Sequence, residues 1–200
     1  ELLVGGVGGD RIYGGAGTDL LFGDNVRLDQ SWSLAPTGWN PSFLRITLLD
    51  HDLLALEAAV PAFGNDYLAG GADNDVIFGQ LGDDTIQGDG SIDLTVGAHR
   101  DAAGHVVLAP SALAPDDGDD YIEAGGGADV VFGNGGSDDI LGGSSALFSL
   151  ATMLDRPDGN DLLFGGAGTN AGRNDDAAAS LADSDVLVGD NGYILRAVPV

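Results

Sequence analysis

The sequence predicts an all-β protein in which short strands stack into a solenoid (a β-solenoid), interrupted by loop and hairpin insertions. Three observations lead to this fold class. A nine-residue unit recurs along the chain, many copies carry an aspartate at the same position, and an aliphatic residue follows two positions later. The stretch GGVGGDRIYGGAGTDLLF, residues 5–22, holds two copies without a break. A unit this short cannot form a core alone, whereas stacked copies bury a continuous aliphatic ladder.

Each position of the unit has a physical reason. Glycine tolerates positive φ, so the glycines that open each copy let the backbone turn sharply. The three closing residues are predicted to alternate outward, inward and outward, as in a short strand. The inward residues of all copies form the expected core ladder: Ile12, Leu21, Leu68, Ile77, Ile86, Ile122, Val131, Ile140, Leu163 and Leu187.

The composition favours bound cations over disorder. The 200 residues carry a formal net charge of −25, yet 44% of them are hydrophobic, and disordered segments are usually poor in apolar residues. Only three of the 32 acidic residues are glutamates. A short carboxylate held next to a turn suits the coordination of a hard cation such as calcium, which prefers oxygen ligands. Cysteine is absent, which excludes disulfides and thiolate metal sites.

The same composition argues against other partners. Nucleic-acid binding requires basic patches, and the chain has seven arginines and no lysine. No apolar run reaches the roughly 20 residues that a membrane span requires. Because the chain begins at Glu1 in the middle of a repeat, we expect it to be a fragment of a longer protein.

The repeats occur in blocks that end at similar junctions, which begin at Gly23, Gly88, Gly142 and Gly189. We therefore predict one repeat domain over 1–200, with insertions at about 27–60, 97–114, 146–155 and 171–181. Loops of this length are often functional.

The insertions have different predicted structures. The first begins with a strand-like VRLDQ segment, after which two tryptophans and two prolines between residues 32 and 41 indicate a loop. Residues 44–56 are apolar enough for either a strand pair or a short helix. The second insertion contains a predicted β-hairpin whose turn lies at 101–104. The third is mostly apolar and the fourth is rich in alanine.

The nonapeptide, with two leading glycines and aspartate at its sixth position, resembles the RTX (repeats-in-toxin, hemolysin-type calcium-binding) family. This resemblance implies a right-handed parallel β-roll in which two nonapeptides form one coil. Ten units keep the motif aspartate, so at least five coils are expected. The resemblance also implies that calcium ions lie between turns on the same side of neighbouring coils, held by motif carboxylates and backbone carbonyl groups.

Carried over to this chain, the family pattern implies binding of multiple Ca²⁺ ions by the motif aspartates: Asp10, Asp19, Asp66, Asp75, Asp84, Asp120, Asp129, Asp138, Asp161 and Asp185. Further turn aspartates are expected to supplement them: Asp24, Asp73, Asp117, Asp158, Asp183 and Asp190. Sites beside positions that depart from the motif are expected to be weaker, namely those at Ala62, Pro115, Pro157 and Asn170.

Catalytic interpretations have weaker support. His51 lies between Asp50 and Asp52, a setting that also suits a zinc site or a general base, but a solvated loop explains it better. His99 and His105 flank the predicted hairpin turn and are interpreted as surface residues. Acid pairs such as that at 83–84 fall within repeats, so coordination explains them better than glycoside hydrolysis.

We therefore expect a non-enzymatic, calcium-binding segment of a secreted bacterial protein, located outside the cell or on its surface and folded by calcium. The expected role is the structural spine of an adhesin, a surface layer or an extracellular assembly, and the resemblance implies type I secretion. Self-association is an expected interaction, as is a cell-surface or glycan partner bound through Trp32 and Trp39. The alternative is a calcium-dependent folding and secretion module of an RTX enzyme or toxin whose catalytic domain lies outside these residues.

Overall fold

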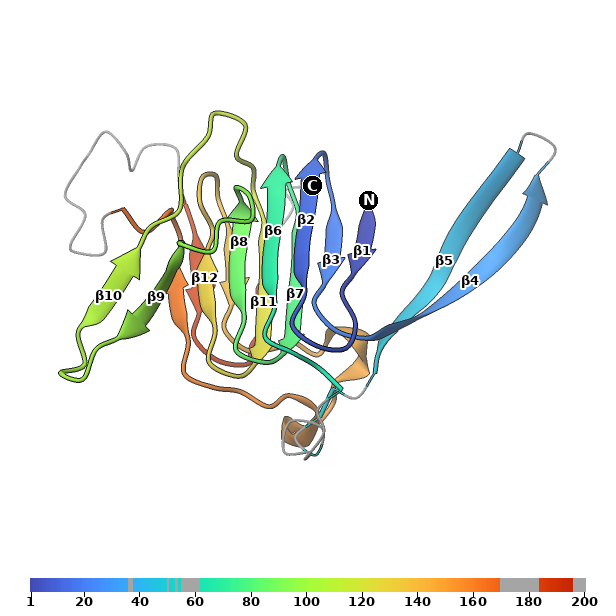
Figure 1. The fold of residues 1–200 in the computed structure, drawn as a ribbon. Coiled ribbons are helices and arrows are strands. Elements are labelled where there is room, and N and C mark those ends of the chain that lie inside the picture. The colour runs from blue at the N-terminus through green and yellow to red at the C-terminus, as the bar shows by residue number, and fades with distance from the viewer. Residues whose placement is uncertain (36–37, 50, 53, 55–61, 170–183, 196–200) are drawn as a thin grey trace.

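Two parallel β-sheets form the body of the protein in the computed structural model (Figure 1). The structure describes residues 1–35, 38–49, 51–52, 54, 62–169 and 184–195, with the backbone alone at 30–44. The first sheet has six strands, in the spatial order β1 (Leu2–Val4), β3 (Leu20–Phe22), β7 (Val76–Leu81), β11 (Tyr121–Gly126), β13 (Asp139–Leu141) and β15 (Val186–Val188). The second has five, in the order β2 (Arg11–Ala16), β6 (Tyr67–Ala72), β8 (Thr85–Asp89), β12 (Val130–Phe132) and β14 (Leu162–Phe164).

The chain alternates between the two sheets, so successive strands wind into coils and each sheet grows by one strand per coil. Every pairing within these sheets is parallel. This arrangement confirms the predicted all-β roll of at least five coils. Insertions leave the roll between coils and return to the next position in the stack, so the spatial order of strands follows the chain order.

The in-register pairing stacks the predicted aliphatic ladder between the sheets. In the first sheet Leu21 pairs with Ile77, which pairs with Ile122. Eight residues of the predicted ladder form one buried cluster, and Leu163 packs against it. Leu187 is predicted to be buried in the ladder, and this prediction is wrong. Leu187 pairs with Ile140 as expected, but it is 41% exposed. The reason is that β15 is the last strand of its sheet in the described chain.

The third closing residue faces outward, as expected, but it is buried at several positions. Phe22, Phe78 and Phe132 are buried, although they follow the inward ladder residue directly. Phe22 and Phe78 stack with centroids 5.1 Å apart, and Phe132 stacks on Phe164 at 5.0 Å. These rings lie on the outer faces of the sheets, where the insertions cover them.

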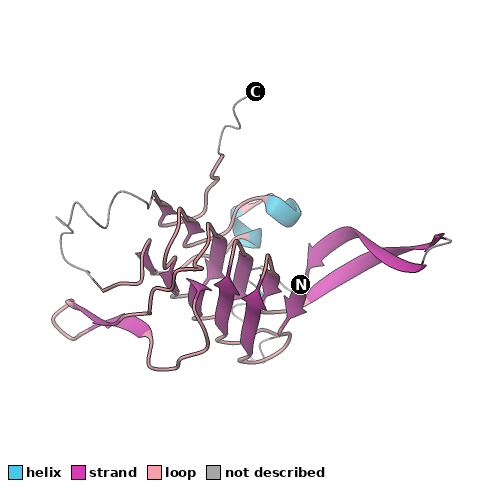
Figure 2. Cartoon of the chain, turned by 90° about the horizontal axis from the view of Figure 1, so that it is seen from above, coloured by secondary structure: helices cyan, strands magenta, loops and turns pink. Residues whose placement is uncertain are grey.

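The segment of the first insertion predicted to be a loop is instead part of a β-hairpin. This insertion forms a long antiparallel hairpin of β4 (Val26–Ala35) and β5 (Gly38–Leu48), which projects away from the roll (Figure 2). The strand-like VRLDQ segment is thus the start of a full strand. For the segment 44–56, β5 extends through Leu48, which favours the strand interpretation there, whereas positions 50, 53 and 55–56 lie outside the described residues.

The second insertion contains the predicted hairpin, made of β9 (Gly97–Arg100) and β10 (Val106–Ala109). The chain beyond it lies against the outer face of the second sheet. There the Ser111 hydroxyl donates to Gln87 Oε1, and the Gln87 amide donates to the Tyr67 hydroxyl at 2.8 Å. A buried polar network therefore seals this face. His99 and His105 are exposed, as predicted.

The third insertion covers the outer face of the first sheet. It contains two short 3-10 turns, η1 (Leu147–Ser149) and η2 (Met153–Asp155). The Phe148 ring lies edge-on to Phe22 and Phe78, with centroids 5.8 and 5.0 Å away. The fourth predicted insertion, 171–181, lies outside the described residues.

His51 is not solvated, in contrast to the sequence-based interpretation. Its side chain is only 7% exposed, and its Nδ1 lies 3.1 Å from the Asp155 carbonyl oxygen, to which it donates. Burial lowers the pKa of His51 from its ordinary value. His51 therefore joins the base of the first insertion to the third.

Candidate metal centre

The motif aspartates form two columns, each running along the start of the strands in one sheet. Every one of them is the residue immediately before a strand, because the glycine turn ends there and extended backbone begins. The column of the first sheet consists of Asp19, Asp75, Asp120, Asp138 and Asp185. The column of the second sheet consists of Asp10, Asp66, Asp84, Asp129 and Asp161.

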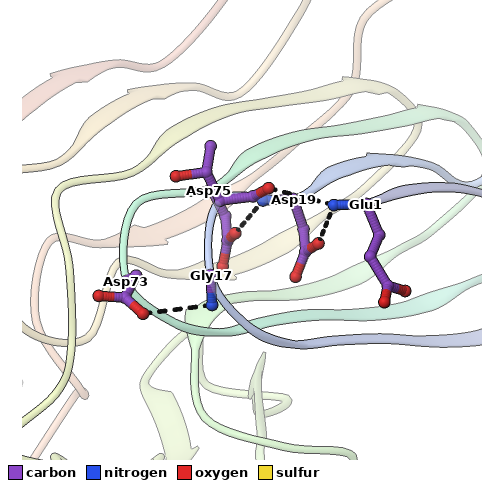
Figure 3. A network of polar contacts seen from close by, with 6 residues as sticks. Glu1, Gly17, Asp19, Asp73 and Asp75 are labelled. Carbon is purple, nitrogen blue, oxygen red and sulfur yellow. Dashed lines mark hydrogen bonds and ion pairs between the residues drawn. The ribbon is translucent and has the colours of Figure 1, made fainter. Parts of the chain in front are cut away.

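One carboxylate oxygen of every motif aspartate except Asp10 accepts a hydrogen bond from the neighbouring coil. The Asp19 backbone N–H donates to Asp75 Oδ1 at 2.7 Å (Figure 3), and the Asp84 N–H donates to Asp129 Oδ1 at 2.8 Å. The same bond recurs along both columns at distances up to 3.0 Å. At the start of the first column, the amino group of Glu1 donates to Asp19 Oδ1. These bonds fix the orientation of each carboxylate.

The second carboxylate oxygen is buried without a hydrogen-bond partner at most positions of both columns. This holds for Oδ2 of Asp10, Asp19, Asp66, Asp75, Asp84, Asp120, Asp129 and Asp161. A buried carboxylate oxygen without a partner is strongly destabilising, because it loses water and gains nothing. The repetition of this arrangement along both columns indicates oxygen sites that fit a cation.

Backbone carbonyl oxygens converge on the same places. A Cβ added at Gly70 would overlap both Asp75 Oδ2 and the carbonyl oxygen of Gly88, which belongs to the next coil. Each such glycine therefore leaves a cradle in which a carboxylate oxygen and a carbonyl oxygen approach one another. The same pairing of oxygens occurs at Gly5, Gly14, Gly23, Gly79, Gly88, Gly133 and Gly142.

The electrostatics of the columns favour a bound cation. Burial raises the pKa of Asp120 to about 9 and that of Asp129 to about 8, with neighbouring carboxylates adding to both shifts. Burial likewise raises the pKa of Asp84 well above its ordinary value, with the Asp129 carboxylate adding to the shift. A nearby cation favours the charged form and reverses this penalty.

The donors fit calcium. The cradles present carboxylate and carbonyl oxygens, and calcium takes six to eight oxygen ligands in flexible geometry. Among the described residues, no three His, Cys, Asp or Glu side chains gather into one cluster. At the eight glycine cradles, the oxygen that faces the motif carboxylate is a backbone carbonyl, as expected for a turn-based site.

The additional turn aspartates are placed differently. Asp24 accepts backbone N–H bonds on both oxygens, from Gly64 at 3.1 Å and from Leu81 at 2.9 Å. Asp73, Asp117 and Asp158 also accept backbone N–H bonds within the turns. Asp190 is exposed, and Asp183 lies outside the described residues, as does Asn170.

One buried aspartate, Asp89, was missed by the sequence analysis. It is fully buried, its Oδ1 accepts the Gly118 N–H at 2.9 Å, and its Oδ2 has no hydrogen-bond partner. Burial raises the pKa of Asp89 to about 7. Its GDG tripeptide, 88–90, aligns with the GDN tripeptide at 23–25, so a comparison of the junctions would have identified it.

Comparison with known families supports the same conclusion. The RTX calcium-binding nonapeptide repeat matches in four copies, at residues 1–25, 62–94, 116–146 and 158–173, which together cover just over half of the chain. No curated protein and no solved structure matches the chain significantly. Within the described residues, no helix has the length and apolar character needed to cross a membrane.

The matched segments contain every motif aspartate except Asp185, and they stop where the insertions begin. The repeats of this family bind calcium, and as a domain they are structural rather than catalytic. The two sheets and their aspartate columns thus form a calcium-binding β-roll, and the chain belongs to the RTX calcium-binding nonapeptide-repeat family.

Proposed function

We propose that this chain is a calcium-folded spine of a secreted bacterial protein and has no catalytic activity of its own. The observation that carries the proposal is the set of buried Oδ2 atoms that lack hydrogen-bond partners in both columns. Two columns of buried carboxylates are unfavourable without cations, so the free energy of calcium binding becomes free energy of folding.

In this proposal the ten motif aspartates bind multiple calcium ions between neighbouring turns. Each contributes Oδ2, the Oδ1 atoms that accept an N–H from the adjacent coil keep that bond, and backbone carbonyl oxygens complete the coordination. Asp24, Asp73, Asp117 and Asp158 have a supporting role, because their oxygens already accept backbone N–H bonds. Ligation by Asp183 and Asp190 remains part of the proposal on the sequence pattern alone.

The proposed mechanism couples folding to location. Where calcium is scarce, as in the cytosol, repulsion between the aspartates keeps the chain loose and suitable for type I secretion. Outside the cell, calcium at roughly millimolar concentration fills sites of the extracellular class. The folded roll then serves as a spine in an adhesin, a surface layer or another extracellular assembly.

Calcium titration followed by circular dichroism tests this proposal. The β-sheet signal should develop as calcium is added and should be lost when EDTA removes it, while magnesium at equal concentration should be much less effective. A chain that keeps its full β-sheet signal in EDTA would contradict calcium-linked folding. A catalytic domain encoded next to these residues would instead make the roll a folding module of an RTX enzyme or toxin.

The proposed spine also requires lateral partners. Self-association is one, and a cell-surface or glycan partner is another. The roll offers such partners the insertions that leave it, and among the described ones the β4–β5 hairpin projects away from the two sheets (Figure 1).

A further inference from the structure

The β4–β5 hairpin, residues 26–48, is called the arm. Its strands have 10 and 11 residues and pair only with each other among the described strands. Both views show the arm standing away from the two sheets (Figures 1 and 2). An isolated two-stranded ribbon is marginally stable in water and needs further strands or a packing surface. Among the described strands, the arm therefore has no pairing partner beyond its own two strands.

The strand register sorts the arm into two faces, because directly paired residues share a face. One set of pairs is apolar except for a single glutamine: Val26–Leu48, Leu28–Ile46, Gln30–Phe43, Trp32–Pro41 and Leu34–Trp39. The other set is polar or small: Arg27–Thr47, Asp29–Arg45, Ser31–Ser42, Ser33–Asn40 and Ala35–Gly38. We call the first set the apolar face of the arm.

A β-bulge is what brings these apolar residues together. The register shifts between Asp29 and Gln30, and it leaves Leu44 of β5 without a cross-strand partner. One extra residue exchanges the faces of everything beyond it. Without the bulge, Phe43, Pro41 and Trp39 would lie on the face opposite Ile46 and Leu48. The backbone irregularity therefore makes one face of the arm apolar along its whole length.

The base of the arm follows the same alternation. Arg27 and Arg45 are exposed there, whereas Leu28 and Ile46 are half-buried. Arg27 forms an ion pair with Asp29 at 3.4 Å on the polar face. At the base of the arm, the charged side chains therefore lie on the polar face only.

Charge separates the arm from the rest of the molecule. The arm contains two arginines and one aspartate, whereas the whole chain has a net charge of −25. Ten strand residues extend about 33 Å, which is several times the Debye length of about 8 Å at physiological salt. Two copies that meet through their arms in antiparallel orientation can therefore keep their acidic rolls beyond the range of strong repulsion.

We propose that the apolar face of the arm binds the same face of a second copy of this chain, related by a two-fold axis. A two-fold contact requires a surface that is complementary to itself, and an apolar face with few charges meets that condition. The inference rests on the proposed role as a spine, for which it names the lateral contact. One face of a two-stranded ribbon is small beside the roughly 800 Å² per partner that a standard interface buries, so the dimer should be weak.

Sedimentation velocity in calcium, from about 10 µM to about 1 mM, tests this pairing in the range expected for a small interface. The wild-type chain should pass from monomer to dimer as the concentration rises. The double variant Trp32→Ser, Trp39→Ser should raise the dissociation constant at least tenfold. The matched double variant Ser33→Ala, Asn40→Ala in the adjacent polar pair should leave the dissociation constant within about twofold of wild type, because surface changes away from a contact are nearly neutral.

A second measurement reports how the two copies are arranged in the dimer, even if a tryptophan variant destabilises the arm itself. The chain has no cysteine, so a single introduced cysteine carries one spin label. In the dimer, labels at Ser42→Cys, near the middle of the arm where a two-fold axis of antiparallel arms would pass, should be close between copies, and labels at Ala128→Cys on an exposed turn of the roll should be far apart. Double electron–electron resonance measures both distances.

Several outcomes would overturn the proposal. The first is a wild-type chain that stays monomeric at about 1 mM, where even weak contacts of this size associate. The second is a dimer whose dissociation constant the tryptophan changes leave unaltered. The third is a dimer in which the labels on the two rolls lie close together. A monomer whose tryptophans bind glycans or lipid vesicles would assign the face to that partner instead. Circular dichroism of the same samples tests calcium-linked folding separately. A chain that folds with calcium but stays monomeric contradicts only the pairing of the arms. A chain that folds and dimerises without calcium contradicts only the calcium-linked spine mechanism.

Discussion

Each motif aspartate gives its two carboxylate oxygens different tasks. Oδ1 of Asp129 accepts the Asp84 N–H at 2.8 Å, whereas Oδ2 is buried without a hydrogen-bond partner. The first oxygen joins coils whether or not a cation is present. The second oxygen is stabilised only when a cation binds beside it, so the two roles can be separated by mutation.

The substitution Asp129→Asn should weaken calcium binding by about tenfold or more, since ligand charge tunes the affinity of oxygen sites. The asparagine keeps an Oδ1 acceptor for Asp84 but loses the charged Oδ2. Isothermal titration calorimetry measures the affinity. Asp119→Asn is the matched control, because Asp119 is exposed and its Oδ1 accepts the Ser137 N–H at 2.7 Å. Equal affinity losses in both variants would contradict the assignment of Oδ2 as a ligand.

Because the glycine cradle has no room for a Cβ atom, adding a single methyl group there should strongly destabilise the fold. In Gly70→Ala the Cβ would overlap Asp75 Oδ2 and the Gly88 carbonyl oxygen. Overpacking of this kind typically destabilises by about 1–3 kcal/mol or more, and here it also displaces two proposed ligands. Thermal unfolding in saturating calcium measures the effect. Gly97→Ala, where a Cβ meets no atom within 4 Å, should leave the midpoint nearly unchanged.

Among the structural elements, the junctions determine where the roll accepts an insertion. Asp24, at the exit of the first insertion, accepts the N–H of Gly64, where the chain returns to the roll. Asp89, at the exit of the second, accepts the N–H of Gly118 at the corresponding return. These aspartates close each insertion at its base. The recurring GDN-like junction is therefore a structural clamp.

The substitution Asp24→Ala should reduce stability in calcium by about 2–4 kcal/mol, because it leaves two backbone N–H groups without acceptors and each costs about 1–3 kcal/mol. Chemical denaturation monitored by circular dichroism gives the free energy of unfolding. Asp29→Ala on the arm is the control, since Asp29 forms only an exposed ion pair. A loss below about 0.5 kcal/mol for Asp24→Ala, the range of ordinary surface changes, would rule out the clamp.

The third insertion should contribute to stability through one aromatic residue. Phe148 lies edge-on to Phe22 and Phe78 on the outer face of the first sheet. Because Phe148 is half-buried, Phe148→Ala should destabilise by about 1–3 kcal/mol, below the range for fully buried phenylalanines. Met153→Ala, at an 86% exposed position in the same insertion, should change the free energy of unfolding little. Similar effects of the two changes would mean that the insertion is not anchored by Phe148.

For the whole molecule, the buried carboxylates link folding, protons and calcium. Burial raises the pKa of Asp24 and Asp129 to about 8 and that of Asp120 to about 9, whereas an aspartate in an unfolded chain titrates near 3.9. The ion-free fold therefore binds more protons than the unfolded chain between these values. By linkage, its stability is greatest below about pH 4 and falls as the pH rises towards 9.

Calcium must displace those protons, so its affinity should rise with pH across the same window. In EDTA the chain should show more β-sheet signal at pH 5 than at pH 8, and the calcium midpoint should be lower at pH 8. Circular dichroism at both pH values measures these quantities. A calcium midpoint independent of pH would contradict the protonated state of the ion-free columns.

The period of the repeat made the roll predictable because each nonapeptide encodes its own turn, carboxylate and core residue. Ile77 and Asp75 therefore occupy the positions that local spacing predicts. Leu187 is exposed despite the same local pattern, because burial depends on a neighbouring strand on each side. The arm also had a readable signal, since Val26, Leu28, Trp32 and Leu34 alternate with polar residues. The tryptophans and prolines obscured it.

The amino-acid sequence alone thus specifies the repeat, its two aspartates per coil and the aliphatic ladder. These features depend on contacts between successive nonapeptides, or between equivalent positions of stacked coils. The outer faces depend on contacts between distant segments. Phe148 on Phe22, His51 against Asp155 and the bulge at Leu44 all required the folded chain to become visible. No local pattern encodes such contacts, because the packing of an insertion depends on which coil it meets when it returns.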